Sequence, residues 1–162
     1  MSTRYVHYGH SKYDRDKVCY AKNQLIPVRC KPAFGLWASR EDSRYGWIDW
    51  CRNQADPDSG EEFGFGNFES SFEFELSPQS KIFEIHSEED ILPYIIRNSI
   101  LGEDSFNLTS IVDGIDFNKM MDDGYDGVEL FLSDDFSMHN GIFNLWDCDS
   151  IVVWNPDIIN TL

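Results

Sequence analysis

The chain has 162 residues and a mass of 18.8 kDa, a length that predicts one domain over residues 1–162. Hydrophobic residues make up 41% and aromatic residues 15%, which excludes a chain that is disordered as a whole. No apolar run approaches the ~18 residues that a membrane span needs, and residues 1–5 lack the apolar stretch of a secretory signal. We therefore expect a cytoplasmic protein without a membrane partner.

The formal net charge of −16 is distributed unevenly along the chain. Residues 1–52 hold ten Lys/Arg and five Asp/Glu, a net of +5, and residues 53–162 hold three and twenty-four, a net of −21. Direct nucleic-acid binding is not expected, because phosphate contacts need clustered cations. The basic segment could line a site for an anionic small molecule, and the acidic remainder could dock on a basic partner.

The common signatures of metal and nucleotide chemistry are missing from the sequence. The four cysteines form no CxxC pair, and no HExxH motif occurs, so no metal site is predicted. We interpret the cysteines as reduced, buried thiols. The sequence also lacks a Walker loop, a GxGxxG fingerprint and a GxSxG elbow.

The first half of the chain predicts short strands and one helix. Strands are expected over 4–8, 33–39, 72–76 and 81–85; in the third, phenylalanine and leucine alternate with glutamate, as on a half-buried strand. A helix over 43–54 carries one stripe at helical spacing, formed by Trp47, Trp50, Cys51 and Gln54. Residues 55–67 form a Gly/Asp-rich loop and are a candidate lid.

The second half predicts two helices and more strands. Ser87 can cap a helix that runs to about Asn98 with Pro93 in its first turns, and a second helix over 115–123 ends at Gly124. Strands are expected over 128–132, 141–147 and 150–154, followed by a short helical turn. Because the connections are short, the strands should pair in antiparallel or mixed fashion. The fold class is α+β, a compact mixed or antiparallel two-sheet domain with short helices.

Three separated elements combine residues that could carry chemistry. The first is the run YVHYGH at 5–10, and the second is GLWAS at 35–39. The third joins GYDGVE at 124–129 to SIVVWNPDII at 150–159. Their order resembles the ADP-ribosyltransferase fold, including the compact versions encoded by bacteria and phages. The resemblance implies a phage or bacterial effector that uses NAD as its substrate.

The resemblance also implies roles for individual residues. His7, with Tyr8 and Gly9 beside it, would bind the nicotinamide ribose, while Trp37 would stack on nicotinamide beside the hydroxyl of Ser39. When the final strand is aligned through Pro156 and Ile159, Ser150 stands at the place of the family's catalytic glutamate. Since the ribosyl cation needs a fixed carboxylate, Asp147 or Glu129 would stabilise it. The basic segment would supply cations for the pyrophosphate, from Arg4, Lys12, Arg15, Arg29, Lys31 and Arg40.

A second function remains open at this point. The protein could be a non-catalytic inhibitor whose acidic surface docks on a basic, nucleic-acid-handling protein. Glu73 and Glu75 share one strand face, and Glu88, Glu89 and Asp90 crowd the start of a helix. Such clusters predict an acidic patch, and the serine at position 150 favours this alternative.

Overall fold

A computed structural model describes residues 2–17, 31–32, 34–54, 70–97 and 112–162 of the chain. The candidate lid at 55–67 lies outside the described residues, as do Cys19, Cys30 and Arg29. In the part described, no helix is long and apolar enough to cross a membrane.

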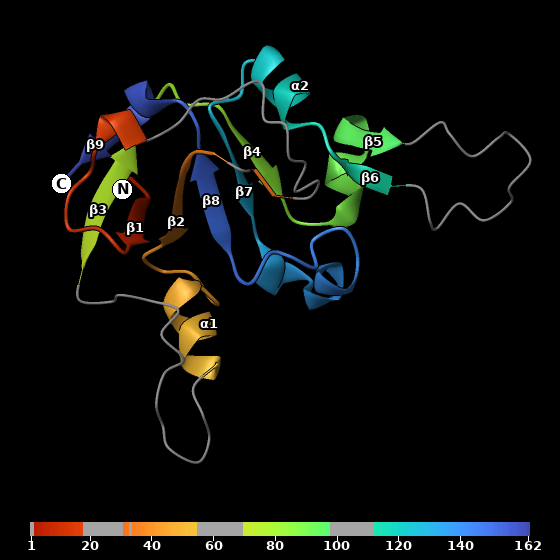
Figure 1. The fold of residues 1–162 in the computed structure, drawn as a ribbon, viewed down its shortest axis with the longest axis horizontal. Helices are drawn as coiled ribbons and strands as arrows, with labels where there is room; N and C mark the ends of the chain where they lie inside the picture. Colours follow the sequence, from red (N-terminus) through yellow and green to blue (C-terminus); the bar gives the residue numbers. More distant parts are fainter. Residues whose placement is uncertain (1, 18–30, 33, 55–69, 98–111) are drawn as a thin grey trace, which may run out of the picture.

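The protein is an α+β fold built on one large, mostly antiparallel sheet with few short helices (Figure 1). Its seven strands run in the order β4-β7-β8-β2-β1-β3-β9, and β5 and β6 form a separate pair. Among the described strands, only β4 and β7 pair in parallel. The strands are β1 (Arg4–Tyr8), β2 (Leu36–Arg40), β3 (Ser71–Leu76), β4 (Ile82–Ile85), β5 (Ile95–Arg97), β6 (Val112–Ile115), β7 (Gly127–Leu130), β8 (Ser150–Val153) and β9 (Ile159–Thr161).

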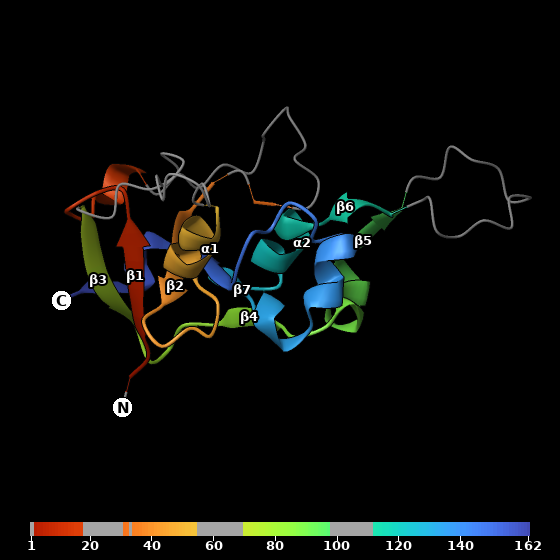
Figure 2. The same ribbon diagram turned by 90° about the horizontal axis from the view of Figure 1, so that it is seen from below.

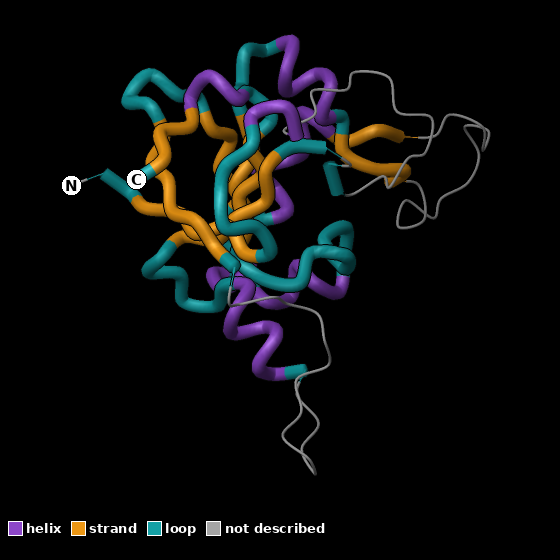
Figure 3. Tube along the Cα trace, turned by 60° about the vertical axis from the view of Figure 1, so that its left-hand side comes forward, coloured by secondary structure: helices purple, strands orange, loops and turns teal. Residues whose placement is uncertain are grey.

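The helical segments are short. Helix α1 (Trp47–Asn53) lies near one end of the central strands and α2 (Phe117–Asp122) near the other (Figure 1). Figure 2 shows both helices from below, and Figure 3 shows the curled course of the strands. The described part also contains 3-10 segments of three to seven residues, at Arg15–Lys17, Glu88–Tyr94, Leu132–Asp134, Phe136–Asn140 and Pro156–Ile158.

The register of the central strands assigns each side chain to one face of the sheet. Trp37 pairs with Val152, which in turn pairs with Val128. The next row joins Ala38, Ile151 and Glu129. Because successive side chains point to opposite faces, these two rows lie on opposite sides of the sheet.

Each face of the sheet has its own hydrophobic core. The larger core packs α2 and the 3-10 segments against β7 and β8, and its fully buried members include Met120, Phe143 and Trp146. The smaller core fills the other face around Tyr5, Phe74, Ile151 and Val153. Strand β8 contributes to both cores, which explains why Ile151, Val152 and Val153 are all fully buried.

The GYDG turn and the WNPD segment, far apart in the sequence, are joined by one aspartate. The Asp126 carboxylate accepts hydrogen bonds from the Lys81 backbone N–H (2.8 Å) and the Asn155 amide (2.6 Å). Its backbone carbonyl accepts from the N–H groups of Trp154 and Asn155. Gly124 permits the turn by adopting a φ of 84°. Asp126 therefore fixes the start of β4 and the end of β8 against the start of β7.

Several predicted elements are confirmed, including β1, β3 and β7 and the helix that ends before Gly124. Gly35 also permits the expected close approach, since a Cβ there would lie 2.8 Å from the Val153 carbonyl oxygen. The expected stripe on α1 is only partly correct, because Cys51 is buried whereas Gln54 is exposed.

Two expectations about local structure are wrong, and one strand was missed. The helix predicted from Ser87 is a 3-10 helix that ends at Tyr94, and the chain continues as β5. Pro93 offers no backbone N–H, and the β-branched Ile95 and Ile96 favour an extended chain. Residues 141–147, predicted as a strand, form consecutive turns in which the Trp146 N–H bonds to the Phe143 carbonyl. The final strand β9 was not predicted, because three residues carry too short a pattern.

We predict that Asp126→Ala destabilises the protein by about 1–3 kcal/mol, because the Lys81 N–H and the Asn155 amide lose their acceptor. Urea unfolding measures the difference. Asp157→Ala is the matched control; its carboxylate pairs with Arg15 at an exposed site, so its removal should cost at most about 1 kcal/mol. Equal losses in the two variants would contradict the role assigned to Asp126.

Candidate functional site

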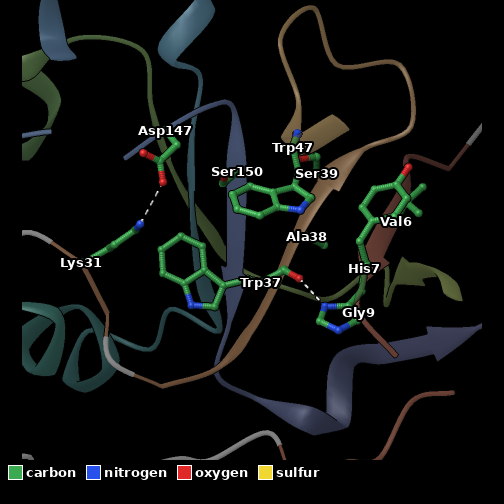
Figure 4. Close-up of a pocket in the computed structure, with 11 residues that line it drawn as sticks. Val6, His7, Gly9, Lys31, Trp37, Ala38, Ser39, Trp47, Asp147 and Ser150 are labelled. Atoms are coloured by element: carbon green, nitrogen blue, oxygen red, sulfur yellow. Dashed lines mark hydrogen bonds and ion pairs between the residues drawn. The ribbon is translucent and has the colours of Figure 1, made fainter. Parts of the chain in front are cut away.

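A cavity of about 300 Å³ opens between β1, β2, the start of β8 and the start of α1 (Figure 4). It brings together seven of the eight residues predicted for the site and leaves out Glu129. The residues that line the cavity are Val6, His7, Tyr8, Gly9, Lys31, Trp37, Ala38, Ser39, Trp47, Asp147 and Ser150. They come from segments that are separated by up to 144 positions in the sequence.

Trp37 forms the centre of the cavity wall. Its indole packs on the fully buried Trp146, with ring centroids 5.0 Å apart. The Lys31 ammonium lies 5.1 Å from the centroid of the Trp37 ring and 3.4 Å from an Asp147 carboxylate oxygen (Figure 4). Both charged side chains are about 30% exposed, so the pair is open to displacement by a ligand. One end of the cavity thus combines an aromatic face with one positive and one negative charge.

His7 is held at the other end of the cavity. His7 follows Val6, whose partner on β2 is Ser39, and its Nδ1–H donates to the Trp37 carbonyl at 2.7 Å. Burial lowers the pKa of His7, and the Trp37 carbonyl offsets only part of that effect. The neutral ring is therefore favoured at neutral pH, with Nε2 as its hydrogen-bond acceptor.

The Ser39 hydroxyl is fully engaged in the structure. It donates to the Asp149 carbonyl (2.9 Å) and accepts from the Trp47 backbone N–H (3.0 Å). Since Trp47 is the first residue of α1, the hydroxyl satisfies a donor at the helix start and sets the Trp47 indole against the cavity. Ser39 therefore positions the cavity wall.

Asp147 and Asp149 have different surroundings, although only one residue separates them. Asp147 lines the cavity, whereas the buried Asp149 carboxylate accepts from the N–H and hydroxyl of Ser133 and from the hydroxyl of Ser43. Those bonds fix the loop between β2 and α1 to the segment after β7. Asp147 is the one carboxylate among the described residues of the cavity lining.

Ser150 lies at the cavity, but its hydroxyl points back to its own chain and donates to the Cys148 carbonyl at 3.1 Å. The Cys148 thiol lies 3.2 Å from the same hydroxyl. Burial raises the pKa of Cys148 to about 11, so the thiol stays protonated at neutral pH. Cys148, like the other described cysteine, Cys51, is buried and forms no disulfide.

Glu129 lies on the opposite face of the sheet from Trp37. Its carboxylate accepts two hydrogen bonds from the Arg40 guanidinium, at 2.7 and 2.8 Å, and one from the Tyr5 hydroxyl at 3.2 Å. Burial and the nearby Glu129 charge raise the pKa of Tyr5. Glu129 is 3% exposed, and its three bonds anchor the rim of the smaller core.

The cations of the basic segment do not gather at one place. Arg4 pairs with Glu73 and Glu75, and Arg15 pairs with Asp157. Arg40 is bound to Glu129, and Lys12 lines a neighbouring cavity. Among the described cations that were expected to contact pyrophosphate, Lys31 alone lines the cavity of Figure 4.

Sequence analysis missed the place of Trp47, which was assigned to the hydrophobic stripe of its helix. The indole is partly exposed and stacks on Trp50, with ring centroids 5.0 Å apart. The available signal was an aromatic residue directly after Gly46, at the first helical position. A side chain at that position projects from the end of the helix.

Comparisons of the chain with protein-family models, with curated proteins and with solved structures found no match. Within the described ranges, no group of three or more His, Cys, Asp or Glu side chains is arranged to hold a metal ion.

We predict that Glu129→Gln lowers the stability of the fold but leaves the affinity of a ligand for the cavity of Figure 4 unchanged. The amide cannot accept the Arg40 fork as a carboxylate does, and breaking such a buried pair costs about 3 kcal/mol. Chemical unfolding gives the stability, and calorimetry with NAD gives the affinity. A folded variant that had lost NAD affinity would place Glu129 in the binding site after all.

Proposed function

We propose that the chain is an ADP-ribosyltransferase-like protein that binds NAD in the cavity of Figure 4 and transfers its ADP-ribose to an acceptor. Support comes from the gathering of six residues from three distant motifs, together with the neighbouring Asp147, around one cavity. Strand order and register, which the assignment did not use, bring them there. An arbitrary set of motif residues has no reason to share a cavity.

The aromatic walls suit a planar ring. Trp37 is fixed from behind by Trp146, and Trp47 lies at the same cavity at the start of α1. Stacking of a base on an aromatic side chain contributes about 1–3 kcal/mol. Nicotinamide is planar and, in NAD, positively charged, so the indole faces and the Asp147 carboxylate would both favour it.

Asp147 is the group we assign to charge stabilisation. In the transfer, the bond between ribose C1′ and the nicotinamide nitrogen breaks, and its electron pair leaves with nicotinamide. The ribose becomes cationic, and an acceptor nucleophile bonds to C1′ and releases its proton. A fixed carboxylate beside the developing cation lowers the barrier, as in glycosidic-bond cleavage. Lys31, 3.4 Å from the Asp147 carboxylate, compensates its charge in the structure.

His7 and Ser150 have supporting roles in this proposal. With Nδ1–H fixed on the Trp37 carbonyl and Nε2 engaged by His10 Nδ1, the His7 ring keeps one orientation in which it would pack against the ribose. The Ser150 hydroxyl, between Cys148 and the cavity, would orient Asp147 or the substrate rather than replace a carboxylate. The acceptor is unassigned.

The alternative of an acidic binding protein has less support from the described residues. Glu73 and Glu75, expected to form part of a free acidic patch, lie within 4.0 Å of Arg4. Asp90 accepts from the N–H groups of His86 and Ser87 and closes the start of a 3-10 helix. These carboxylates have partners within the fold.

We predict that Trp37→Ala weakens NAD binding about 5- to 150-fold in calorimetry, the equivalent of the 1–3 kcal/mol that one stacking contact contributes. Trp37→Phe is the matched control, because it keeps an aromatic face and should retain most of the affinity. Equal affinities of the alanine variant and the native protein, both folded, would contradict the assignment of the cavity.

We also predict that Asp147→Asn lowers the rate of ADP-ribose transfer or NAD hydrolysis about 100- to 1,000-fold and leaves NAD affinity nearly unchanged, because preorganised charge acts mainly in the transition state. Incubation with labelled NAD, with and without cell extract, measures the rate. Asp157→Asn changes an exposed carboxylate that does not line the cavity and should keep full activity. Full activity of Asp147→Asn would exclude this residue as the stabilising group.

A further inference from the structure

A second cavity, of about 160 Å³, lies beside the first and shares His7 and Trp37 with it. Pockets that hold a whole small molecule measure about 300–1,000 Å³. The second cavity is smaller, so it suits one group of a ligand whose remainder occupies the first. Its polar lining comes from β1 and the loop that follows it, and consists of His7, His10, Lys12, Tyr13 and Asp14.

His7 and His10 form a hydrogen-bonded pair in the wall of this cavity. His7 Nε2 and His10 Nδ1 lie 2.9 Å apart, and the two rings are nearly parallel with centroids 5.2 Å apart. Gly9, with a φ of 107°, turns the chain so that His10 returns to His7. The ring of Phe72, 4.9 Å from His7, supports the pair from the neighbouring strand.

The hydrogen bonds leave room for one additional proton. The Trp37 carbonyl can only accept, so the His7 proton sits on Nδ1 and His7 Nε2 accepts from His10 Nδ1–H. A further proton fits on His10 Nε2 without breaking either bond, whereas a second would place two N–H groups face to face. The pair can therefore change from neutral to a single positive charge while it keeps its geometry.

The charged surroundings of the pair are mixed. Lys12 and Asp14 line the same cavity, and the Arg15–Asp157 pair lies beyond Tyr13, whose hydroxyl donates to the Pro156 carbonyl. Burial lowers the pKa of His7, so an additional proton is disfavoured on that ring. An anion placed between the pair and Lys12 would stabilise the singly charged pair and draw a proton onto it.

We propose that the second cavity is an anionic subsite, in which a phosphoryl group binds to Lys12 and the His7–His10 pair with uptake of one proton. The proposal rests on the proposed function only in taking a nucleotide as the source of the phosphoryl group. Since His7 and Trp37 line both cavities, a ring stacked in the first cavity and a phosphate in the second belong to one nucleotide.

ADP-ribose and nicotinamide are the probes that test this subsite. The phosphates of ADP-ribose carry no proton near neutral pH, so any proton taken up comes to rest on the protein. Calorimetry in two buffers of different ionisation enthalpy measures that uptake. We expect uptake with ADP-ribose and none with neutral nicotinamide. ADP-ribose affinity should rise as the pH falls from about 8 to about 6, by at most about tenfold per unit for one proton.

Two variants separate the contributions. His10→Asn should abolish the proton uptake and flatten the pH dependence, and Lys12→Gln should weaken ADP-ribose binding but keep the uptake. Lys119→Gln, an exposed lysine on α2, is the control and should change neither. Imidazole NMR signals of His7 and His10 give a second readout that is independent of affinity, since both should shift when ADP-ribose binds.

The outcomes distinguish this inference from the proposed function. ADP-ribose that binds without proton uptake, or with uptake that persists in His10→Asn, would overturn the subsite and leave the NAD cavity standing. Proton-linked binding of ADP-ribose by a protein that neither binds nicotinamide nor cleaves NAD would support the subsite and refute the proposed function. A failure of ADP-ribose to bind at all would overturn the subsite.

Discussion

The alternation of side chains along β2 decides which residues can act together. Trp37 and Ser39 face one side of the sheet, where the cavity lies, and Arg40 faces the other side with Glu129. No change of rotamer can move a side chain through a paired sheet. The glutamate on β7 therefore serves the smaller core, and Asp147, on the turn before β8, supplies the carboxylate of the cavity.

The end of the β1–β2 pairing provides the second requirement of the site. Beyond Val6 and Ser39, the His7 ring takes the place of a strand hydrogen bond by donating to the Trp37 carbonyl. That single bond fixes the tautomer of His7 and links two residues that line both cavities. It also leaves His7 Nε2 to accept the hydrogen bond from His10. Local strand geometry, acid–base state and ligand binding are thus coupled at one residue.

The sequence predicted the strands with clear alternation, such as 72–76, and it identified six residues of the cavity from three motifs and Asp147 from its place beside the last one. The sequence could not show that Glu129 is buried, because a glutamate between apolar residues is typical of a half-buried strand. Only the neighbouring strands show that both faces of β7 are covered. The aromatic run at 141–147 suggested a strand, but Phe143 and Trp146 are buried from consecutive turns. The sequence did not place Trp47 at the cavity, because its helical spacing assigned it to a hydrophobic stripe. Periodicity does not show which end of a short helix lies at a cavity.

An NMR titration of the protein, labelled at the tryptophan indole nitrogens, with NAD tests the central claim most directly. The account predicts that the Trp37 and Trp47 indole signals shift together and saturate. The signal of Trp154 should stay in place, because its indole N–H is buried and bonded to the Tyr125 carbonyl. Saturating NAD that leaves the Trp37 and Trp47 signals unmoved would contradict the claim that this cavity is a nucleotide site.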